Sequence, residues 1–168
     1  MGIGQISLLV DSPLRTVSLA FAGLDAEVRK QITRQVKTES KPIWFEEIRD
    51  RASTRLQQRV LAGTARTGVA GLNVRLMAGG GKKLSSGTPT ADLVKATEFG
   101  ANPGRTQTVR SRKGKQYQRR LGGRFPAPRR GGYVVYPAAK AAIPRVASLV
   151  VQTTVRTIHE TIEGVSNG

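Results

Sequence analysis

The sequence predicts an α+β fold in a single domain covering residues 1–168, with N-terminal helices, a small antiparallel sheet with a long basic loop, and a long C-terminal helix packed on the sheet. Three observations carry this prediction. Apolar residues recur with helical spacing before residue 62, residues 72–76 alternate apolar and polar side chains, and helical spacing returns after residue 142. The chain is long enough to bury one modest core.

The first part of the chain is predicted to form a short edge strand and then helices. Residues 6–10 are an apolar run, and Asp11-Ser12-Pro13 breaks it. Residues 14–22 fit either a strand or a helix, and one or two helical turns are the preferred interpretation. Asp25 is a suitable N-cap for the next helix. The apolar stripe of that helix has i, i+4 spacing and consists of Leu24, Val28, Ile32 and Val36.

Pro42 is expected to interrupt this helix near Ser40, because proline lacks an amide hydrogen and clashes with the preceding turn. A second helix is predicted from Pro42 to Leu61, followed by Gly63. Its aromatic residues Trp44 and Phe45 are expected in the core or in a subunit contact rather than stacked on nucleic-acid bases. Its carboxylates lie in the first half, where they favour the helix dipole; they are Glu46, Glu47 and Asp50.

The predicted sheet consists of short strands in the middle of the chain. Residues 64–71 are interpreted as a turn, and residues 72–76 as a half-buried strand. After a flexible turn at residues 79–83, residues 91–99 are predicted to form the antiparallel partner. Residues 133–136 return as a strand.

The last helix is predicted to begin in the segment bracketed by Pro137 and Pro144. Its long apolar face extends from Ile143 to Ile162, and Gly164 ends it.

An extended basic loop is predicted at about residues 103–131, between the last two of these strands. It has no acidic residue, and it contains ten cationic residues: Arg105, Arg110, Arg112, Lys113, Lys115, Arg119, Arg120, Arg124, Arg129 and Arg130. Three interpretations of the loop stay open. It is a solvated arm without a partner, a segment that binds nucleic acid without base specificity, or a segment that docks on an acidic protein surface.

The net charge is +17, from 28 Lys and Arg against 11 Asp and Glu. Like charges at this density repel one another, so nucleic acid or an acidic protein is the expected class of partner. Aromatic residues make up 5% of the chain, which disfavours binding by stacking on single-stranded bases. No apolar stretch approaches the ~20 residues of a membrane helix, so no membrane partner is expected.

The sequence predicts a protein that is not an enzyme and has no cofactor and no metal. It contains no cysteine and one histidine, His159, which has no second ligand or nucleophilic serine in view. The run at residues 79–83 is not a phosphate-binding loop, because Leu76 and Lys83 stand where that motif requires Gly and Ser or Thr.

Glu98 is an acidic residue whose position is not explained by a solvated role on the surface. It stands at the end of a predicted strand, beside Phe99 and Gly100 and facing the basic loop. A carboxylate in this position is expected to pair with an arginine, within the chain or across an interface, in a structural role.

The run from Ala96 to Ala101 resembles the Tyr-Ala-x-x-Glu-Phe-Gly-Thr segment of the neck, or tail-component, proteins of long-tailed bacteriophages. In that family a Thr-Gly-x-Leu segment precedes the sheet, and an insertion separates the Glu-Phe-Gly segment from a Pro-Phe-x-x-Pro-Ala segment that opens a C-terminal helix. Here the matching segments are Arg66–Leu72, Phe125-Pro126 and Tyr136-Pro137-Ala138, in the same order over residues 24–163. The versions from phages of actinobacteria, labelled head-to-tail connector or tail-completion proteins, are the most similar.

The resemblance implies a non-enzymatic subunit of the virion's head–tail junction, assembled in the host cytoplasm. Copies would form a hexameric ring around the DNA channel, next to connector or stopper, tail terminator or tail-tube proteins. The ten loop cations would contact DNA or these partners, and a structural or interface role would fall to Glu98, Phe99, Gly100, Tyr136 and Pro137. The alternative is a general, sequence-independent nucleic-acid-binding protein.

A closed ring needs two different patches on each subunit. The candidates are the exposed face of the last helix and the sheet edge near Glu98.

Overall fold

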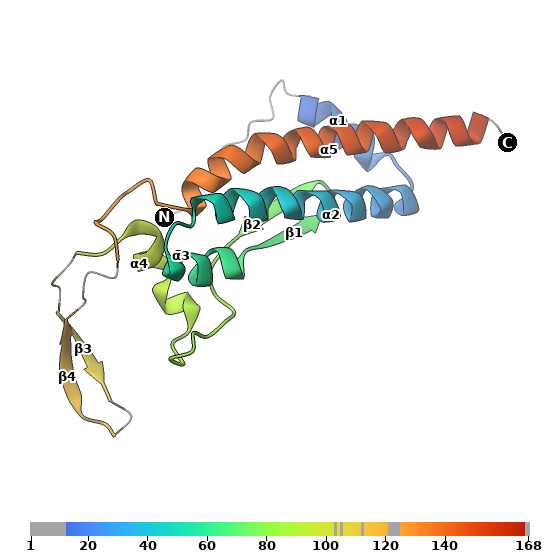
Figure 1. The fold of residues 1–168 in the computed structure, drawn as a ribbon. Coiled ribbons are helices and arrows are strands. Elements are labelled where there is room, and N and C mark those ends of the chain that lie inside the picture. Colours follow the sequence, from blue (N-terminus) through green and yellow to red (C-terminus); the bar gives the residue numbers. More distant parts are fainter. Residues whose placement is uncertain (1–12, 103, 105, 112, 121–124, 167–168) are drawn as a thin grey trace. The chain divides into compact units, whose positions relative to one another are not determined.

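The structure is a computed structural model that describes residues 13–102, 104, 106–111, 113–120 and 125–166. The predicted strand at residues 6–10 lies outside them, as do Arg105, Arg112 and Arg124. The helices are α1 (Pro13–Ala22), α2 (Ala26–Arg51), α3 (Arg55–Val60), α4 (Val94–Phe99) and α5 (Val135–Ser166), with 3₁₀ turns at Ala62–Thr64 and Thr90–Leu93. The strands are β1 (Arg66–Ala70), β2 (Asn73–Met77), β3 (Thr106–Arg110) and β4 (Gln116–Arg120) (Figure 1). The predicted α+β class is confirmed.

The chain divides into two compact units. The first comprises the described residues of 1–44, 67–76 and 141–168, and the second those of 45–66 and 77–140. Helices α2 and α5 each contribute residues to both units.

The core of the first unit is formed where α2 and α5 meet the β1–β2 hairpin. Ile32, Val36 and Val150 are buried there, and the partly buried side chains around them are Phe21, Leu24, Val28, Val69, Leu72 and Val74. The predicted stripe on the first long helix and the packing of the last helix on the sheet are both confirmed. Each fully buried Ile or Val contributes about 1.5–3 kcal/mol of transfer free energy.

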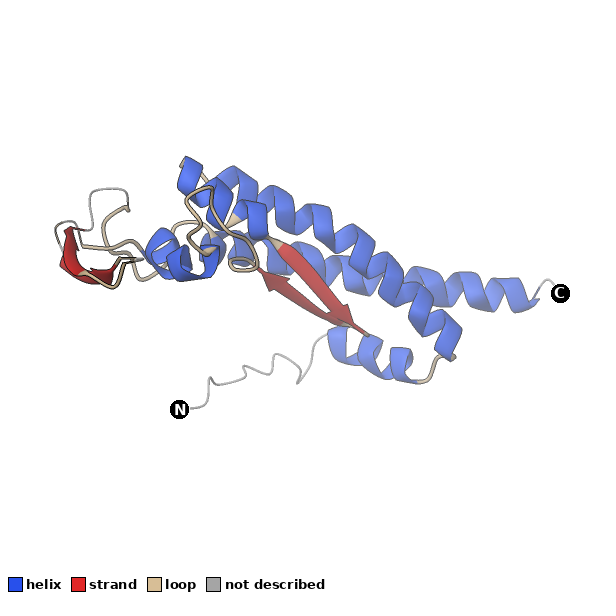
Figure 2. Ribbon diagram, turned by 90° about the horizontal axis from the view of Figure 1, so that it is seen from below, coloured by secondary structure: helices blue, strands red, loops and turns tan. Residues whose placement is uncertain are grey.

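The strand pairing differs from the prediction. β2 pairs with β1, which the sequence analysis interpreted as a turn, and not with residues 91–99. Only Gly71 and Leu72 connect the two strands, and Gly71 has a φ of 59°. A two-residue connection with a glycine at its first position is typical of hairpins, so the neighbouring segment is the partner. The strands form two separate hairpins, β1–β2 and β3–β4 (Figure 2).

The predicted break at Pro42 is wrong, because α2 continues to Arg51 with Pro42 inside it. Trp44 and Ile48 are fully buried, and the burial of two such side chains outweighs the cost of about 3 kcal/mol for an internal proline. The helix ends instead before Thr54, which caps α3. The Thr54 hydroxyl accepts a hydrogen bond from the Gln57 backbone amide at 3.2 Å, and the Gln57 side chain accepts one from the Thr54 backbone amide at 3.1 Å.

Residues 91–99 form helix rather than the predicted strand. Thr97 and Glu98 are adjacent in sequence and both buried, whereas a strand with one solvated face would point one of them into water. The predicted strand at residues 133–136 is also wrong, because α5 begins at Val135. Pro137 falls in the first turn of α5, where no intrahelical amide bond is lost.

Candidate functional site

Glu98 binds the start of α5 through its buried carboxylate. Oε2 accepts from the backbone amides of Val134 and Val135 at 3.1 and 2.8 Å, and Oε1 accepts from the amide of Tyr136 at 3.1 Å. The first amides of a helix have no intrahelical partner and carry the positive end of its dipole. A carboxylate therefore satisfies them with charge-assisted bonds. Within the described residues the partners of Glu98 are these amides rather than the expected arginine.

Backbone hydrogen bonds extend this contact on both sides of Glu98. The amide of Tyr133 donates to the Glu98 carbonyl at 2.9 Å, and that of Arg129 donates to the Phe99 carbonyl at 2.8 Å. The amide of Ala101 donates to the Pro126 carbonyl at 3.0 Å. We call the contact between residues 98–101 and residues 126–136 the Glu98 clamp. It closes the base of the basic segment.

Two glycines make the clamp sterically feasible. Gly100 and Gly132 have φ values of 77° and 66°, a region that side chains with a Cβ rarely adopt. A Cβ on Gly100 would lie 2.5 Å from the Pro126 carbonyl oxygen, and one on Gly132 would overlap the Glu98 carboxylate. The order Glu-Phe-Gly thus has a physical reason. The glutamate caps α5, and the glycine, which has no Cβ, allows close contact with the backbone of Pro126 and Ala127.

Aromatic side chains complete the clamp. The rings of Phe99 and Tyr136 meet edge to face with centroids 5.4 Å apart. The Arg129 guanidinium lies over the Tyr133 ring, 5.3 Å from its centroid. The Tyr133 hydroxyl donates to the Ala127 carbonyl at 2.9 Å.

The structure brings together the five residues that the sequence analysis chose for a structural role. Glu98, Phe99 and Gly100 meet the α5 start that contains Tyr136 and Pro137. Sequence reasoning missed Gly132 and Tyr133. The Gly131-Gly132 pair directly before the helix was the signal for a special backbone conformation there.

The basic segment contains the β3–β4 hairpin, where the sequence analysis expected only a loop. Thr106 pairs with Arg120 at one end of the register and Arg110 with Gln116 at the other. In the connecting turn, the Ser111 amide donates to the Lys115 carbonyl at 2.8 Å, and Gly114 has a φ of 80°. The cations are therefore carried on a two-stranded ribbon.

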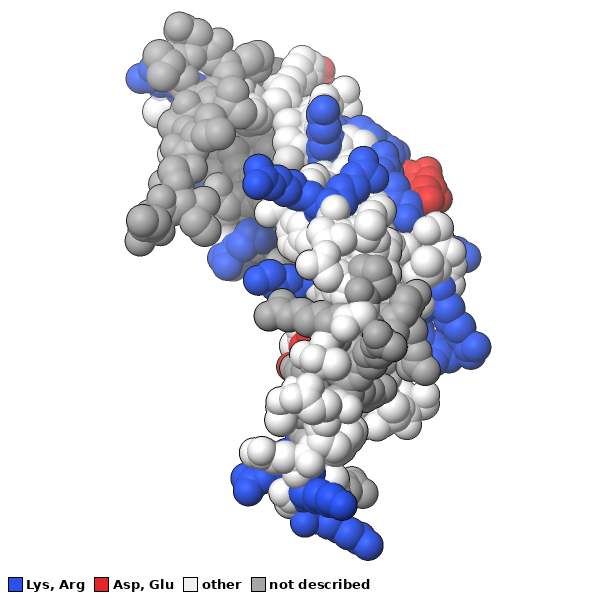
Figure 3. All heavy atoms as spheres, turned by 90° about the vertical axis from the view of Figure 1, so that its left-hand side faces the viewer, with Lys and Arg blue, Asp and Glu red and all other residues white. Residues whose placement is uncertain are grey.

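Cationic side chains are concentrated at the turn of this hairpin. Arg110, Lys113 and Lys115 are exposed there, and the Arg110 Nε donates to the Gly114 carbonyl at 3.2 Å. In Figure 3, Lys and Arg side chains lie at the lower end of the view without Asp or Glu beside them, and others lie over the upper part of the same face. The sequence has no Asp or Glu between Glu98 and Glu160 to neutralise them.

The other predicted loop cations are distributed between the clamp and the second strand. Arg129 and Arg130 are exposed within the clamp. Arg119 and Arg120 are in β4, where the structure gives their strand positions alone. Cations on such a ribbon attract phosphates and carboxylates through their charge, and contacts to phosphate carry no base sequence information.

No known protein family, curated protein or solved structure that was compared with the chain matches it. Within the part of the chain that the structure describes, no three His, Cys, Asp or Glu side chains are placed to hold a metal ion. None of the described helices is long and apolar enough to span a bilayer. The clamp and the hairpin are therefore the features of the described residues that bear on function.

Proposed function

We propose that this chain is a non-enzymatic structural subunit of the head–tail junction of a long-tailed bacteriophage. In this function, copies assemble into a hexameric ring around the DNA channel and join the tail end to the connector beneath the portal. The ring lies in the virion, and its neighbours are connector or stopper, tail terminator or tail-tube proteins. The proposal starts from the ordered motifs that resemble the neck proteins.

The observation that carries the proposal is the Glu98 clamp. Two of the segments on which the resemblance depends are Glu98-Phe99-Gly100 and Tyr136-Pro137-Ala138. They are distant in sequence, and the Glu98 carboxylate binds the amide of Tyr136 across 38 residues. The clamp supports the resemblance because it gives both segments one structural purpose.

The β3–β4 hairpin supports the position next to DNA or an acidic neighbour. The clamp fixes its base, and its exposed cations have no acidic residue near them in the sequence. Ring formation brings one such hairpin from every copy to the same assembly. The positive electrostatic potential of several such hairpins together is suited to a channel that holds DNA, or to docking on an acidic ring.

The exposed cations at the hairpin turn also favour a second candidate function, sequence-independent binding of nucleic acid by the monomer. The two functions predict different behaviour in solution. A nucleic-acid-binding protein works without self-association, and its affinity falls steeply with salt because each neutralised phosphate releases counterions.

Light scattering of the purified protein, at low and high salt, with and without double-stranded DNA, tests the proposal. We expect a discrete ring, or subunits that bind DNA weakly until they meet their neighbours. Electron microscopy of the same samples checks the symmetry. A monomer that binds DNA tightly, with an affinity that falls steeply between about 50 and 200 mM salt, as about six or more phosphate contacts would require, overturns the proposal in favour of the second candidate.

A further inference from the structure

Helix α5 has a second apolar stripe besides the one in the core. The side of α5 that faces the core includes Ala142, Val146, Val150, Thr154 and Thr157, which are buried. Other apolar residues recur at intervals of three and four, which places them on one side of a helix with 3.6 residues per turn. We call them the outer stripe: Val151, Val155, Ile158 and Ile162. Val155 and Ile162 are 53% and 64% exposed, so this side of α5 is open to a partner.

Acidic side chains flank the outer stripe. The groove beside it, of about 550 Å³, is lined by Val151, Val155, Arg156, His159 and Glu160 among others. Arg156 lies 3.9 Å from Glu160 and 3.8 Å from Glu39, and His159 lies 3.3 Å from Glu163. Two copies of a chain with a net charge of +17 repel one another over most of their surface. In these ion pairs around the outer stripe the carboxylates of Glu39, Glu160 and Glu163 outnumber the one arginine, Arg156, so the repulsion between two copies is weaker there.

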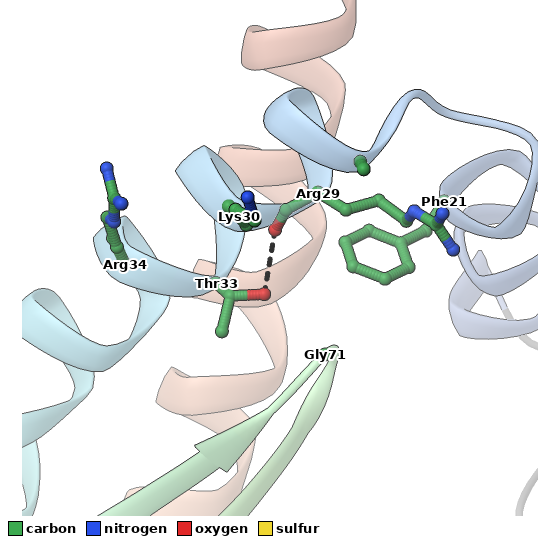
Figure 4. Close-up of a pocket in the computed structure, with 7 residues that line it drawn as sticks. Phe21, Arg29, Lys30, Thr33, Arg34 and Gly71 are labelled. Carbon is green, nitrogen blue, oxygen red and sulfur yellow. Dashed lines mark hydrogen bonds between the residues drawn. The ribbon is translucent and has the colours of Figure 1, made fainter.

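A groove with the opposite charge lies between the end of α1, the first turns of α2 and the β1–β2 turn (Figure 4). Its volume is about 440 Å³, and its lining includes Phe21, Arg29, Lys30, Thr33, Arg34 and Gly71. Lys30 is paired with Glu27 at 2.7 Å. Within the described residues, Arg29 and Arg34 form no ion pair. We call this the cationic groove. It combines the half-buried ring of Phe21 with two cations that a carboxylate can neutralise.

We propose that the outer stripe of one copy docks into the cationic groove of the next copy. Ile162 contacts Phe21 in this interface, and Glu160 and Glu163 face Arg29 and Arg34. The two patches are different, so the contact is head to tail, which is the kind of interface that generates a closed ring. The inference rests on the proposed ring and names the surfaces that build it.

Charge exchange tests the pairing. Glu160→Lys/Glu163→Lys places cations against the neighbour's cationic groove, and Arg29→Glu/Arg34→Glu places acids against the neighbour's outer stripe. Each variant alone is expected to lose self-association in light scattering while its circular dichroism stays unchanged, because the four side chains are exposed. Mixing the two variants restores the assembly, because every contact then joins opposite charges. Under conditions in which the natural chain forms a ring, assembly by either variant alone, or none in the mixture, overturns the pairing.

Cysteine cross-linking detects the contact even where assembly is transient, because the natural chain contains no cysteine. A mixture of Ile162→Cys and Thr33→Cys is expected to form a disulfide-linked dimer under mild oxidation, and Ile162→Cys alone is expected to remain monomeric. A dimer from Ile162→Cys alone would mean that two outer stripes pack on each other, which overturns the pairing. A ring of normal mass without the mixed cross-link sinks this inference and leaves the proposed function standing. A monomer that binds DNA tightly removes both.

Discussion

At the scale of single residues, Glu98 determines how α5 begins. Its side chain is 2% exposed and accepts hydrogen bonds from three backbone amides of the following segment. Such groups are costly to leave unpaired once they are buried, because water cannot replace the lost acceptor. One side chain thus connects the end of α4 to the start of a 32-residue helix.

Replacing Glu98 with Gln is expected to lower the free energy of unfolding by about 2–3 kcal/mol. The substitution keeps one acceptor oxygen but turns an NH₂ group toward backbone donors, so at least one amide loses its partner. Urea unfolding followed by circular dichroism measures the change. Asp92→Asn is the matched control, because Asp92 is an exposed acid of the same unit. An equal loss in both variants would show that charge, and not capping, is responsible.

The sequence allowed Glu98 to be singled out, but not its partners to be named. A carboxylate next to Phe-Gly and a basic loop predicts an arginine partner, because charge is visible in a sequence. The amides that it binds belong to residues 36 to 38 positions away and are accessible because Gly132 has a positive φ. Contacts of this kind depend on tertiary structure that no local pattern encodes.

At the scale of elements, the helix ends follow capping more closely than proline. The Thr54-x-x-Gln57 capping box is legible in the sequence and marks the start of α3. In the sequence, Pro42 predicts a break, but α2 tolerates it because the side chains beyond it are buried. Long amphipathic helices were therefore predictable, whereas residues 66–70 and 91–99, which are short and mixed in composition, took their structure from their neighbours.

The hairpin is predicted to act through its charge. Changing Arg110, Arg112, Lys113 and Lys115 to Ser should leave the circular dichroism of the chain unchanged, because the cations described among them are exposed. It should block assembly of infectious particles in a complementation assay. The physical reason is the loss of up to four contacts to phosphate or carboxylate.

The control for this experiment removes the same charge elsewhere. Lys37, Arg55, Arg75 and Lys95 are exposed and lie outside the basic segment, so changing them to Ser alters the net charge equally. We expect infectivity to survive in this control. Normal infectivity in the hairpin variant would show that the hairpin is dispensable.

At the scale of the whole molecule, self-repulsion is the main electrostatic fact. A net charge of +17 on 168 residues opposes compaction. We expect the melting temperature to rise by about 2–4 °C between about 0.05 and 0.5 M NaCl, because salt screens charges over a length of about 10 Å at 0.1 M. Differential scanning calorimetry at constant pH measures this shift. The melting temperature of the four-Ser hairpin variant should rise less with salt. A melting temperature that falls with salt would contradict the explanation.

The clamp also has a consequence for how chains of this kind diverge. Since Ala101 and Pro126 are already hydrogen-bonded to each other, everything between them is a loop whose ends are fixed. The entropy of closing such a loop grows slowly, by about 0.6 kcal/mol for each doubling of its length. Insertions, deletions and changes of charge in the hairpin therefore leave the helical scaffold nearly unaffected. The hairpin is free to change with whatever it touches, while the residues that close the loop are not.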